Sequence, residues 1–304
     1  MNPDTCNTAP LASVSSREYR MSFAWVPPSR EVEMGGGPRV RRSYWFTGAF
    51  AVLLTALAGS PGLALPRPGD APRSANYSEV VLADQPIMYW RLGELKGRTA
   101  FDSSGHLRNA TYLHHPRKGK PGAIVNDPDT SVRFDGVDDF ARWKPDTSYS
   151  GSFSAEAWVR STVRGVQDQA FLSTRGRHVD YSFDIKLERS NVYGYGVRVD
   201  VGNGSTWFVT ETIDFAWKRY RWYHIVGVAT LADVTIYVNG SSIGTLSYGT
   251  GGTPLLFDVN HPVQMGRASP FASWFTGKID EVAFYDYALT SDQVSAHYAA
   301  GIGP

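Results

Sequence analysis

The chain has 304 residues, of which 42% are hydrophobic and 13% aromatic, and this is enough apolar material for a folded core rather than a disordered chain. Its 30 Lys and Arg residues nearly balance its 29 Asp and Glu residues, so no overall positive charge is available to hold a nucleic-acid backbone. The single Cys excludes an intramolecular disulfide. The 30 Gly and 18 Pro residues, spread among many aromatics, favour short strands joined by turns.

Residues 34–64 have the pattern of an export signal. Arg39, Arg41 and Arg42 form a charged beginning, residues 45–58 are uncharged and mostly apolar, and Gly62-Leu63-Ala64 supplies the small residues of a cleavage site. The arginine pair loosely matches a twin-arginine signal, although the general secretory route fits the downstream residues better. Residues 1–33 would then be a non-native or disordered extension. These features predict an extracellular, secreted or cell-envelope protein.

A membrane anchor is the alternative for the same segment. Residues 43–66 are uncharged and long enough to cross a bilayer, which takes about 20 residues, but Gly59 to Gly62 interrupt the second half. Both interpretations place the rest of the chain outside the cytoplasm. Because Cys6 lies in the leader, the exported part must draw its stability from its core or from a bound metal.

After the leader, the pattern indicates strands nearly throughout. Residues 65–76 form a Pro-rich linker, and residues 77–83 form a short helical turn with Asn76 as its N-cap. Residues 153–160 alternate with period two, so that Phe153 and Val159 share one face and Trp158 and Arg160 the other. We expect the earlier strands at residues 87–92, 132–134, 153–160, 181–187, 194–201 and 206–210.

The second half of the chain predicts a three-stranded meander. Residues 223–229, 234–238 and 241–246 read as consecutive strands, with Asn239-Gly240 in a hairpin turn. Strands follow at residues 264–266 and 278–285. A helix over residues 292–300 begins after Thr290 or Ser291 and has Gly301 just past its end. Short strands without interleaved helices predict an all-β antiparallel sandwich, in one domain over residues 77–304.

Four segments in this order resemble the laminin-G-like (LamG) branch of the concanavalin A-like lectin/glucanase jelly-roll family. They are Tyr89-Trp90-Arg91-Leu92-Gly93-Glu94 with Asp102-Ser103-Ser104-Gly105; Phe134-Asp135-Gly136; Phe153-Ser154-Ala155-Glu156-Ala157-Trp158 with the later meander; and Gly277-Lys278-Ile279-Asp280-Glu281-Val282. The resemblance covers roughly residues 77–300. It implies two antiparallel sheets packed face to face, a short C-terminal helix and often one calcium ion at the rim. It leaves the function open, because this fold hosts glycan binders, adhesion modules and some glycosidases.

Asp280 and Asp102 are the candidate calcium ligands. Strict alternation puts Asp280 on the same face as Val282 and Phe284, where a buried carboxylate needs a cation or several hydrogen-bond donors. Asp102 begins a tight turn, and calcium prefers such oxygen ligands. The resemblance implies that both carboxylates, with the carbonyl of Gly105, hold the ion. The alternatives are an Asx-turn at Asp102 and an ion pair at Asp280. The sequence departs from the family after this turn, with His106-Leu107-Arg108 in place of the usual Asn-Gly-Asn.

No catalytic group stands out, and we predict a protein that is not an enzyme. Strict alternation places Asp280 and Glu281 on opposite faces of their strand, which does not suit the paired carboxylates of a glycosidase. The exported part has no Cys and no Gly-x-Ser-x-Gly nucleophile turn.

Aromatic side chains are the candidate ligand-binding groups, since sugars stack on flat apolar rings. Each of the five candidates could instead fill the core. The sequence thus predicts an exported, non-catalytic module that binds a carbohydrate or a cell-envelope or matrix surface, with calcium as a candidate stabilising ion. A glycoside hydrolase or lyase of the same fold and a protein-binding adhesion module are the alternatives. The candidate binding residues are Trp143, Tyr149, Trp207, Phe271 and Trp274.

Overall fold

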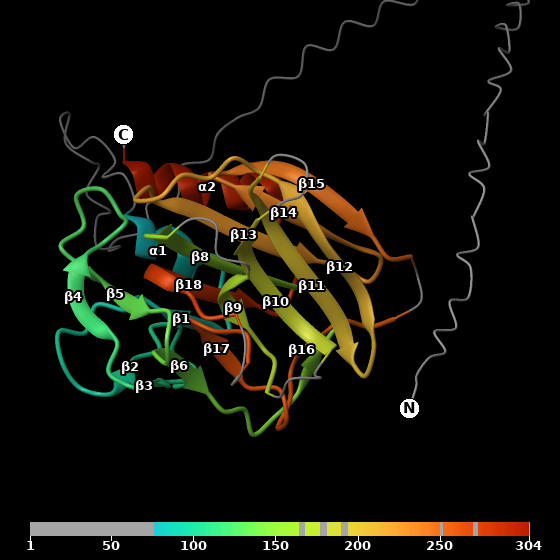
Figure 1. The fold of residues 1–304 in the computed structure, drawn as a ribbon, viewed down its shortest axis with the longest axis horizontal. Coiled ribbons are helices and arrows are strands. Elements are labelled where there is room, and N and C mark those ends of the chain that lie inside the picture. Colours follow the sequence, from blue (N-terminus) through green and yellow to red (C-terminus); the bar gives the residue numbers. More distant parts are fainter. Residues whose placement is uncertain are drawn as a thin grey trace, which may run out of the picture. The chain divides into compact units, whose positions relative to one another are not determined.

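The computed structural model describes residues 76–163, 168–176, 181–189, 194–249, 252–269 and 273–303 (Figure 1). The predicted extension, the export signal with its anchor alternative, and the linker up to residue 75 lie outside the described residues, as does Phe271. Neither helix of the described part is long and apolar enough to cross a bilayer.

Two eight-stranded antiparallel sheets form the domain, which confirms the predicted sandwich. Sheet A has the order β15-β14-β13-β8-β18-β5-β4, with β1 paired to the free part of β18. The β13-β14-β15 meander matches the predicted one. The strands of sheet A are β1 (Met88–Trp90), β4 (Arg117–Pro121), β5 (Thr130–Asp135), β8 (Phe153–Ser161), β13 (Tyr223–Ala229), β14 (Asp233–Val238), β15 (Ser241–Ser247) and β18 (Thr276–Tyr285).

Sheet B has the order β12-β11-β10-β9-β17-β6-β3-β2, and two short strands pair with each other in a small third sheet. That third sheet consists of β7 (Tyr149–Ser150) and β16 (Leu255–Phe257). The strands of sheet B are β2 (Thr99–Ala100), β3 (Ala110–Leu113), β6 (Phe140–Trp143), β9 (Gln169–Ser173), β10 (Tyr181–Glu188), β11 (Gly196–Gly204), β12 (Trp207–Asp214) and β17 (Val263–Met265).

The main core lies between the two sheets and follows from period-two alternation. Val159 of β8 and Val199 of β11 are completely buried in the same apolar cluster, and Phe153 meets Phe183 edge to face with 5.1 Å between ring centroids. Each such side chain gains roughly 1.5–3 kcal/mol on full burial. Packing of the inward faces therefore stabilises the sandwich, and the main core does not require apolar residues on the outward faces.

A second, smaller core covers the outer face of sheet A under the helices α1 (Tyr77–Ala83) and α2 (Ser291–Ile302). Both helices begin with a capping box. Asn76 is the predicted N-cap of α1, and Thr290 is one of the two candidates predicted for α2. The end of α2 differs from the prediction. Gly301 is inside the helix, which ends only at Gly303 with φ +70°.

β18 departs from strict alternation at a β-bulge. Asp280 pairs with Trp158 and Ala283 with Glu156, so one extra residue enters β18, and Glu281 adopts a φ of +48°. Ile279, Val282 and Phe284 join the main core, whereas the carboxyls of Asp280 and Glu281 both meet groups of the outer layer. The predictions that Asp280 shares the face of Val282 and Phe284, and that the two acids point to opposite faces, were therefore wrong.

Candidate functional site

The outer face of sheet B carries an unbroken row of polar residues. Cross-strand pairing connects one residue of each strand directly to the next, from β12 at one edge to β2 at the other. Every member of this row, called the polar row below, can form hydrogen bonds. Its members are Thr210, Asp200, Asp184, Ser173, Gln264, Arg142, Thr111 and Thr99.

The neighbouring row on the same strands shows how different the two faces are. Val199, Ile185, Leu172, Met265 and Ala141 follow one another in register and are all fully buried in the main core. Because successive residues of a strand alternate between faces, the apolar row fixes the register and thereby aligns the polar row on the opposite side.

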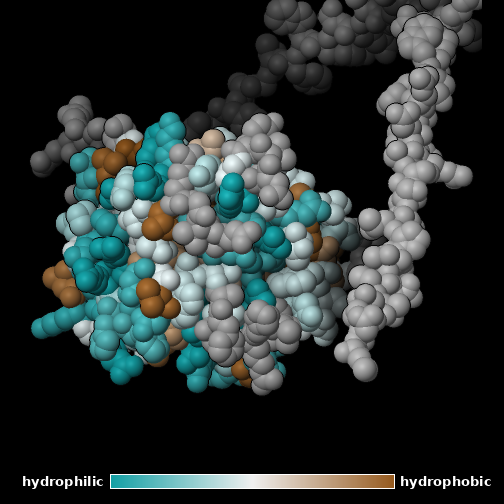
Figure 2. Space-filling view, viewed as in Figure 1, coloured by the Kyte–Doolittle hydropathy of each residue, from teal (hydrophilic) through white to brown (hydrophobic). Residues whose placement is uncertain are grey.

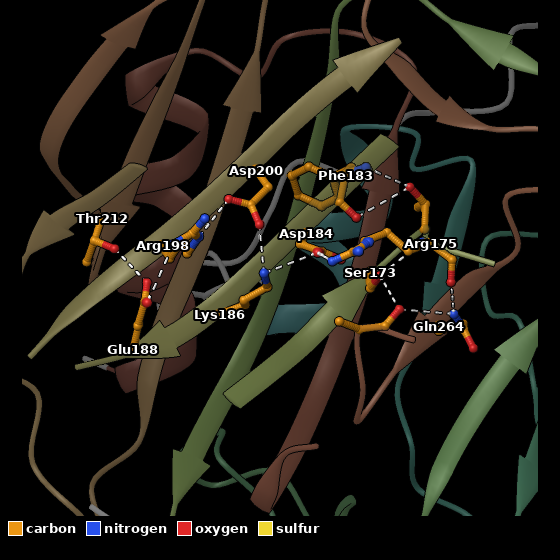
Figure 3. Close-up of polar contacts among 12 residues, drawn as sticks. Ser173, Arg175, Phe183, Asp184, Lys186, Glu188, Arg198, Asp200, Thr212 and Gln264 are labelled. Carbon is orange, nitrogen blue, oxygen red and sulfur yellow. Dashed lines mark hydrogen bonds and ion pairs between the residues drawn. The ribbon is translucent and has the colours of Figure 1, made fainter. Parts of the chain in front are cut away.

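An ion-pair network fills the middle of the polar face (Figure 3). Lys186 Nζ lies 2.7 Å from Asp200 Oδ2 and 3.3 Å from Asp184 Oδ2, and Arg175 Nη1 lies 3.0 Å from the same oxygen of Asp184. Arg198 Nε donates to Asp200 at 2.8 Å, and its Nη1 is 3.5 Å from Glu188. Three cations thus alternate with three carboxylates, and all of them except Arg175, which follows β9, are on β10 and β11.

Burial and neighbouring charges have opposite effects on the pKa values of the buried members of this network. Asp184 and Lys186 are almost completely buried, and burial raises the pKa of Asp184 against the opposing effect of Lys186 and Arg175. Burial acts to lower the pKa of Lys186, but Asp184 and Asp200 outweigh it and raise that pKa above its ordinary value. Each charge therefore depends on its partners, since an isolated buried ion is very costly.

One end of the polar row opens to solvent in a groove with a volume of about 400 Å³. Thr111 is exposed and Arg142 half-buried, and Trp143 and Asn109 stand beside them. Hydrogen-bond donors and acceptors thus line a concave surface next to an indole ring. The lining residues are Asn109, Thr111, Leu113, Arg142, Trp143 and Lys144.

Three of the predicted aromatic residues border this face, and an arginine stands beside each. Trp143 lines the groove, and its ring, which packs against the main core, lies 5.4 Å from the guanidinium carbon of Arg108. Trp274 lies 5.4 Å from the guanidinium carbon of Arg267, which binds the amide oxygen of Gln264 in the polar row. Trp207 lies 5.5 Å from the guanidinium carbon of Arg175, the partner of Asp184. Trp207 is on β12 and Trp143 on β6, with β11, β10, β9 and β17 between them, so the three rings do not form a single platform.

Tyr149 has a different environment from these three. It lies in the small β7-β16 sheet, and its hydroxyl donates to the carbonyls of Ser152 and Asp286. Its ring also contacts the ring of Phe257. The hydroxyl is therefore engaged in holding the chain together. Its role in ligand binding stays a prediction.

The predicted calcium ligands have contrasting partners. Asp102 accepts backbone N–H groups from Tyr89 and Ser104 on one oxygen and from Arg108 on the other, which is the Asx-turn alternative. Asp280 accepts the N–H of Ala123 on Oδ2, while its buried Oδ1 has no hydrogen-bond partner in the described part of the chain. The orphaned oxygen of Asp280 suits a hard cation, whereas Asp102 already has a full set of donors.

The surroundings of Asp280 also suit such an ion. A Cβ at position 122 would lie 2.8 Å from the carbonyl oxygen of Asp129 and 3.1 Å from Oδ2 of Asp280, so only the missing side chain of Gly122 lets these oxygens converge. Gly105 has a φ of +91°, as its turn requires. Asp129 could not be predicted from the sequence pattern, because it lies in a loop without regular spacing.

The ion-pair network was not predicted, although the sequence of β10 contains a signal for it. Ser182, Asp184, Lys186 and Glu188 occupy alternate positions of β10, between apolar residues that face the core. Period-two alternation predicts four polar side chains on one face of that strand. The pairing of that face with Asp200 on β11 could not be predicted, because it depends on the register between strands.

Comparison with known proteins agrees with this architecture. A family model described as the concanavalin A-like lectin/glucanases superfamily matches residues 126–295, which is more than half of the chain. Domain 4 of AbnA, an extracellular arabinanase from Geobacillus stearothermophilus solved in complex with arabinotriose, superposes with a TM-score of 0.51 at 19% identity, over 71% of this chain and 98% of that one. No curated protein shows significant sequence similarity to the chain.

Two toxin domains have similar folds. The binding domain of Paraclostridial Mosquitocidal Protein 1 gives a TM-score of 0.53 at 15% identity, and the ligand-binding domain of botulinum neurotoxin serotype D, in complex with N-acetylneuraminic acid, gives 0.53 at 10% identity. Each match covers 71% of this chain but only 52% of the toxin chain. The two-sheet topology and the family match confirm the resemblance in the sequence, and the chain belongs to the concanavalin A-like lectin/glucanases superfamily.

Proposed function

We propose that the domain is a non-catalytic carbohydrate-binding module that uses the outer face of sheet B. The observation that carries the proposal is the polar row, whose solvent-exposed end opens into a groove beside Trp143. A sugar has apolar ring faces and a rim of hydroxyls, so it stacks on indole rings and bonds to arginine, amide and hydroxyl groups. The groove offers all of these in one place.

The structural relatives support the same class of ligand. The arabinanase domain was solved with arabinotriose and the neurotoxin domain with N-acetylneuraminic acid. Both ligands are carbohydrates, although the superposition covers only 52% of the neurotoxin chain, against 98% of the arabinanase domain. At 10–19% identity these matches establish the fold only, so the choice of sugar has to come from this chain's own groove.

The alternative activity is glycoside cleavage, which one observation favours. Asp184 and Glu188 lie on one face of β10, and burial raises the pKa of both, as in a general acid. Against it, Asp184 has no exposed surface, and its Oδ2 is bound by Lys186 and Arg175. A general acid must reach the glycosidic oxygen, so the geometry favours binding without turnover.

Substitution of Thr111 by Trp tests the binding groove without removing a core residue. Thr111 is exposed on β3, and Trp suits a strand, so the variant should fold while its indole fills the groove. We expect retardation in gels containing neutral polysaccharides such as arabinan to fall at least tenfold. The matched control is Thr245→Trp on the exposed part of β15 in sheet A, which should bind as the unmodified protein does.

The same experiment separates the alternatives. Binding of a polysaccharide without new reducing ends supports a binding module. New reducing ends that disappear in the Asp184→Asn variant would instead show that the protein is a glycoside hydrolase. The protein could instead capture an envelope protein that free sugars do not displace and retain no polysaccharide. That result would show a protein-binding adhesion module rather than a carbohydrate-binding one. Equal retardation of Thr111→Trp and Thr245→Trp would remove the groove from the proposal.

Two further features belong to this proposal. The export pattern of residues 34–64 supports action outside the cytoplasm, on free or envelope-bound glycans. The orphaned oxygen of Asp280 supports a bound calcium ion, which the carbonyl of Asp129 would help to hold. There the ion would neutralise buried carboxylates and stabilise the fold, and no chemical step depends on it.

A further inference from the structure

Sheet A carries a row of four positive charges on its outer face. Arg117 of β4 pairs with Arg133 of β5, Arg133 pairs with Lys278 of β18, and Lys278 pairs with Arg160 of β8. The four residues occupy four adjacent strands in direct register and are called the cationic row below. Val132, Ile279 and Val159 precede or follow members of the row and are buried in the main core, so alternation turns the four cations outward.

The cationic row is unfavourable for the isolated domain. Like charges directly opposite each other across a strand pair destabilise a sheet, and three such pairs follow one another here. Among the described residues no ion pair involves any of the four. Lys278 Nζ donates to the carbonyl of Pro121 at 3.1 Å, and Nε of Arg160 is buried without a hydrogen-bond acceptor in that part of the chain. Arg117 and Arg133 are exposed, and Lys278 and Arg160 are half-buried.

The surroundings define the shape of the surface. Figure 2 shows hydrophilic residues gathered over the part of the molecule where Figure 1 places β4 and β5. Beyond β8, the indole of Trp222 lies 6.0 Å from Nζ of Lys278, so the row ends beside an aromatic ring. Asp135 and the buried Asp139 line a pocket together with Arg117 and Arg133, and Asp135 Oδ1 accepts backbone N–H groups. Asp280, the residue after Ile279 in β18, is buried.

The length of the row indicates the kind of partner. Adjacent strands are about 4.8 Å apart, so four cations span roughly 15 Å in a nearly straight line. One small anion could contact only one or two of them. An extended chain with negative groups at regular short intervals would neutralise all four, and its sugar rings would have Trp222 to stack on.

We propose that this face of sheet A binds a linear acidic polysaccharide, with carboxylate or sulfate groups along the cationic row and a sugar ring on Trp222. The surface lies on the opposite sheet from the groove at Thr111 and does not depend on that site. The domain would then hold two glycan chains, or two parts of one chain, on its two outer faces.

Polygalacturonate and its fully methyl-esterified form test this proposal, because they share a backbone and differ in charge. We expect the protein to bind polygalacturonate, with an affinity that falls steeply as salt rises, and to lose at least tenfold in the double variant Arg133→Gln/Lys278→Gln. The charge-matched control Lys96→Gln/Arg219→Gln removes two exposed cations outside the row and should retain most of the affinity. The esterified polymer should bind equally to all variants.

The double variant also provides a measurement that needs no ligand. Removing two like charges from the row should raise the melting temperature at low salt, and 1 M salt should abolish the difference. Equal loss of binding in the double variant and in its control would overturn the proposal. Preference for duplex DNA or for phosphatidylserine vesicles over polygalacturonate and dextran sulfate would overturn it as well. Thr111→Trp should not alter binding to polygalacturonate. A negative result for the cationic row can therefore be distinguished from a negative result for the groove at Thr111.

Discussion

His297 of α2 places its Nδ1 atom 3.0 Å from Oε2 of Glu156 on β8, and both side chains are fully buried. The same carboxylate oxygen lies 2.8 Å from Nε2 of His224, and Nε2 of His297 lies 2.9 Å from Asp84. Burial acts to lower the pKa of His297, but Glu156 and Asp84 outweigh it and raise that pKa to about 9. An ion pair that can be titrated therefore joins the C-terminal helix to sheet A.

This contact predicts that stability falls at alkaline pH. In the unfolded chain His297 has a pKa of about 6.5, so the folded state binds the proton more tightly between that value and about 9. The stabilisation is complete below about pH 6.5 and is lost as pH rises through 9. We expect the free energy of unfolding to decrease by on the order of 2 kcal/mol over this range, measured by urea denaturation at constant ionic strength.

His297→Gln should be less stable at pH 6.5 and should lose most of this pH dependence. The control is His106→Gln, which changes an exposed histidine and should keep the slope. A His297→Gln protein with the full slope would assign the pH dependence to other groups.

The ion-pair network of sheet B predicts a large effect of losing Lys186. Lys186→Met leaves Asp184 and Asp200 as neighbouring buried carboxylates without their shared cation, and breaking such a buried pair costs about 3–5 kcal/mol. Adding Asp200→Asn to the same chain removes one of the two negative charges and should restore part of the loss. Chemical denaturation of both variants measures this, and a single variant within about 1 kcal/mol of the unmodified protein would contradict the buried assignment.

The substitution Gly301→Ala should destabilise the protein, opposite to the usual effect of replacing glycine by alanine in a helix. Glycine to alanine inside a helix usually stabilises by about 1 kcal/mol. Here the new Cβ would lie 2.3 Å from Cζ2 of the buried Trp158, so overpacking should dominate and destabilise the protein by about 1–3 kcal/mol. Ser295→Ala at an exposed position of α2 is the control and should change stability by no more than about 0.5 kcal/mol. Increased stability of Gly301→Ala in thermal melts would show that Trp158 can move aside.

Calcium should raise the melting temperature through Asp280. An ion present at 100 times its Kd would stabilise the folded state by about 2.7 kcal/mol. We expect melting to shift down with chelator and up with calcium, and Asp280→Asn to abolish the shift. The variant Asp146→Gln, which removes an exposed carboxylate, is the control for general charge effects. An unchanged melting temperature, with no metal found by elemental analysis, would exclude the ion.

The leader predicts a defined mature start. Expression of the full chain with its own N-terminus should yield a secreted or envelope form whose first residue is Leu65, determined by N-terminal sequencing. An intact N-terminus in the membrane fraction would favour the anchor formed by residues 43–66. Intact product in the cytosol would contradict export.

Regular alternation made much of the fold predictable. Residues 153–160 and the meander over residues 223–246 correspond to β8, β13, β14 and β15 with nearly the expected bounds. The cap at Asn76 also stands where the sequence placed it, and Thr290 is one of the two residues proposed for the second cap. These features are local, because they depend on the period of apolar residues and on side chains three positions apart.

The bulge at Glu281 shows where local patterns fail. Nothing in the run Ile279-Asp280-Glu281-Val282 reveals that one extra residue enters the strand, because the bulge depends on how β18 pairs with β8. The bulge changes the face of the sheet to which Glu281 points. It thereby changes the partners of both Asp280 and Glu281. The same limit applies to Trp143, Trp207 and Trp274, which the sequence could propose singly but could not place relative to one another.

The amino-acid sequence by itself determined the sandwich class, the superfamily, the outward and inward faces of regular strands and the positions of both helices. Only the tertiary structure decided which outward faces adjoin, and thereby produced the polar row on sheet B, the cationic row on sheet A and the buried contact of His297 with Glu156. The physical reason is that alternation is set within one strand, whereas strand order and register follow from burying the whole apolar core at once.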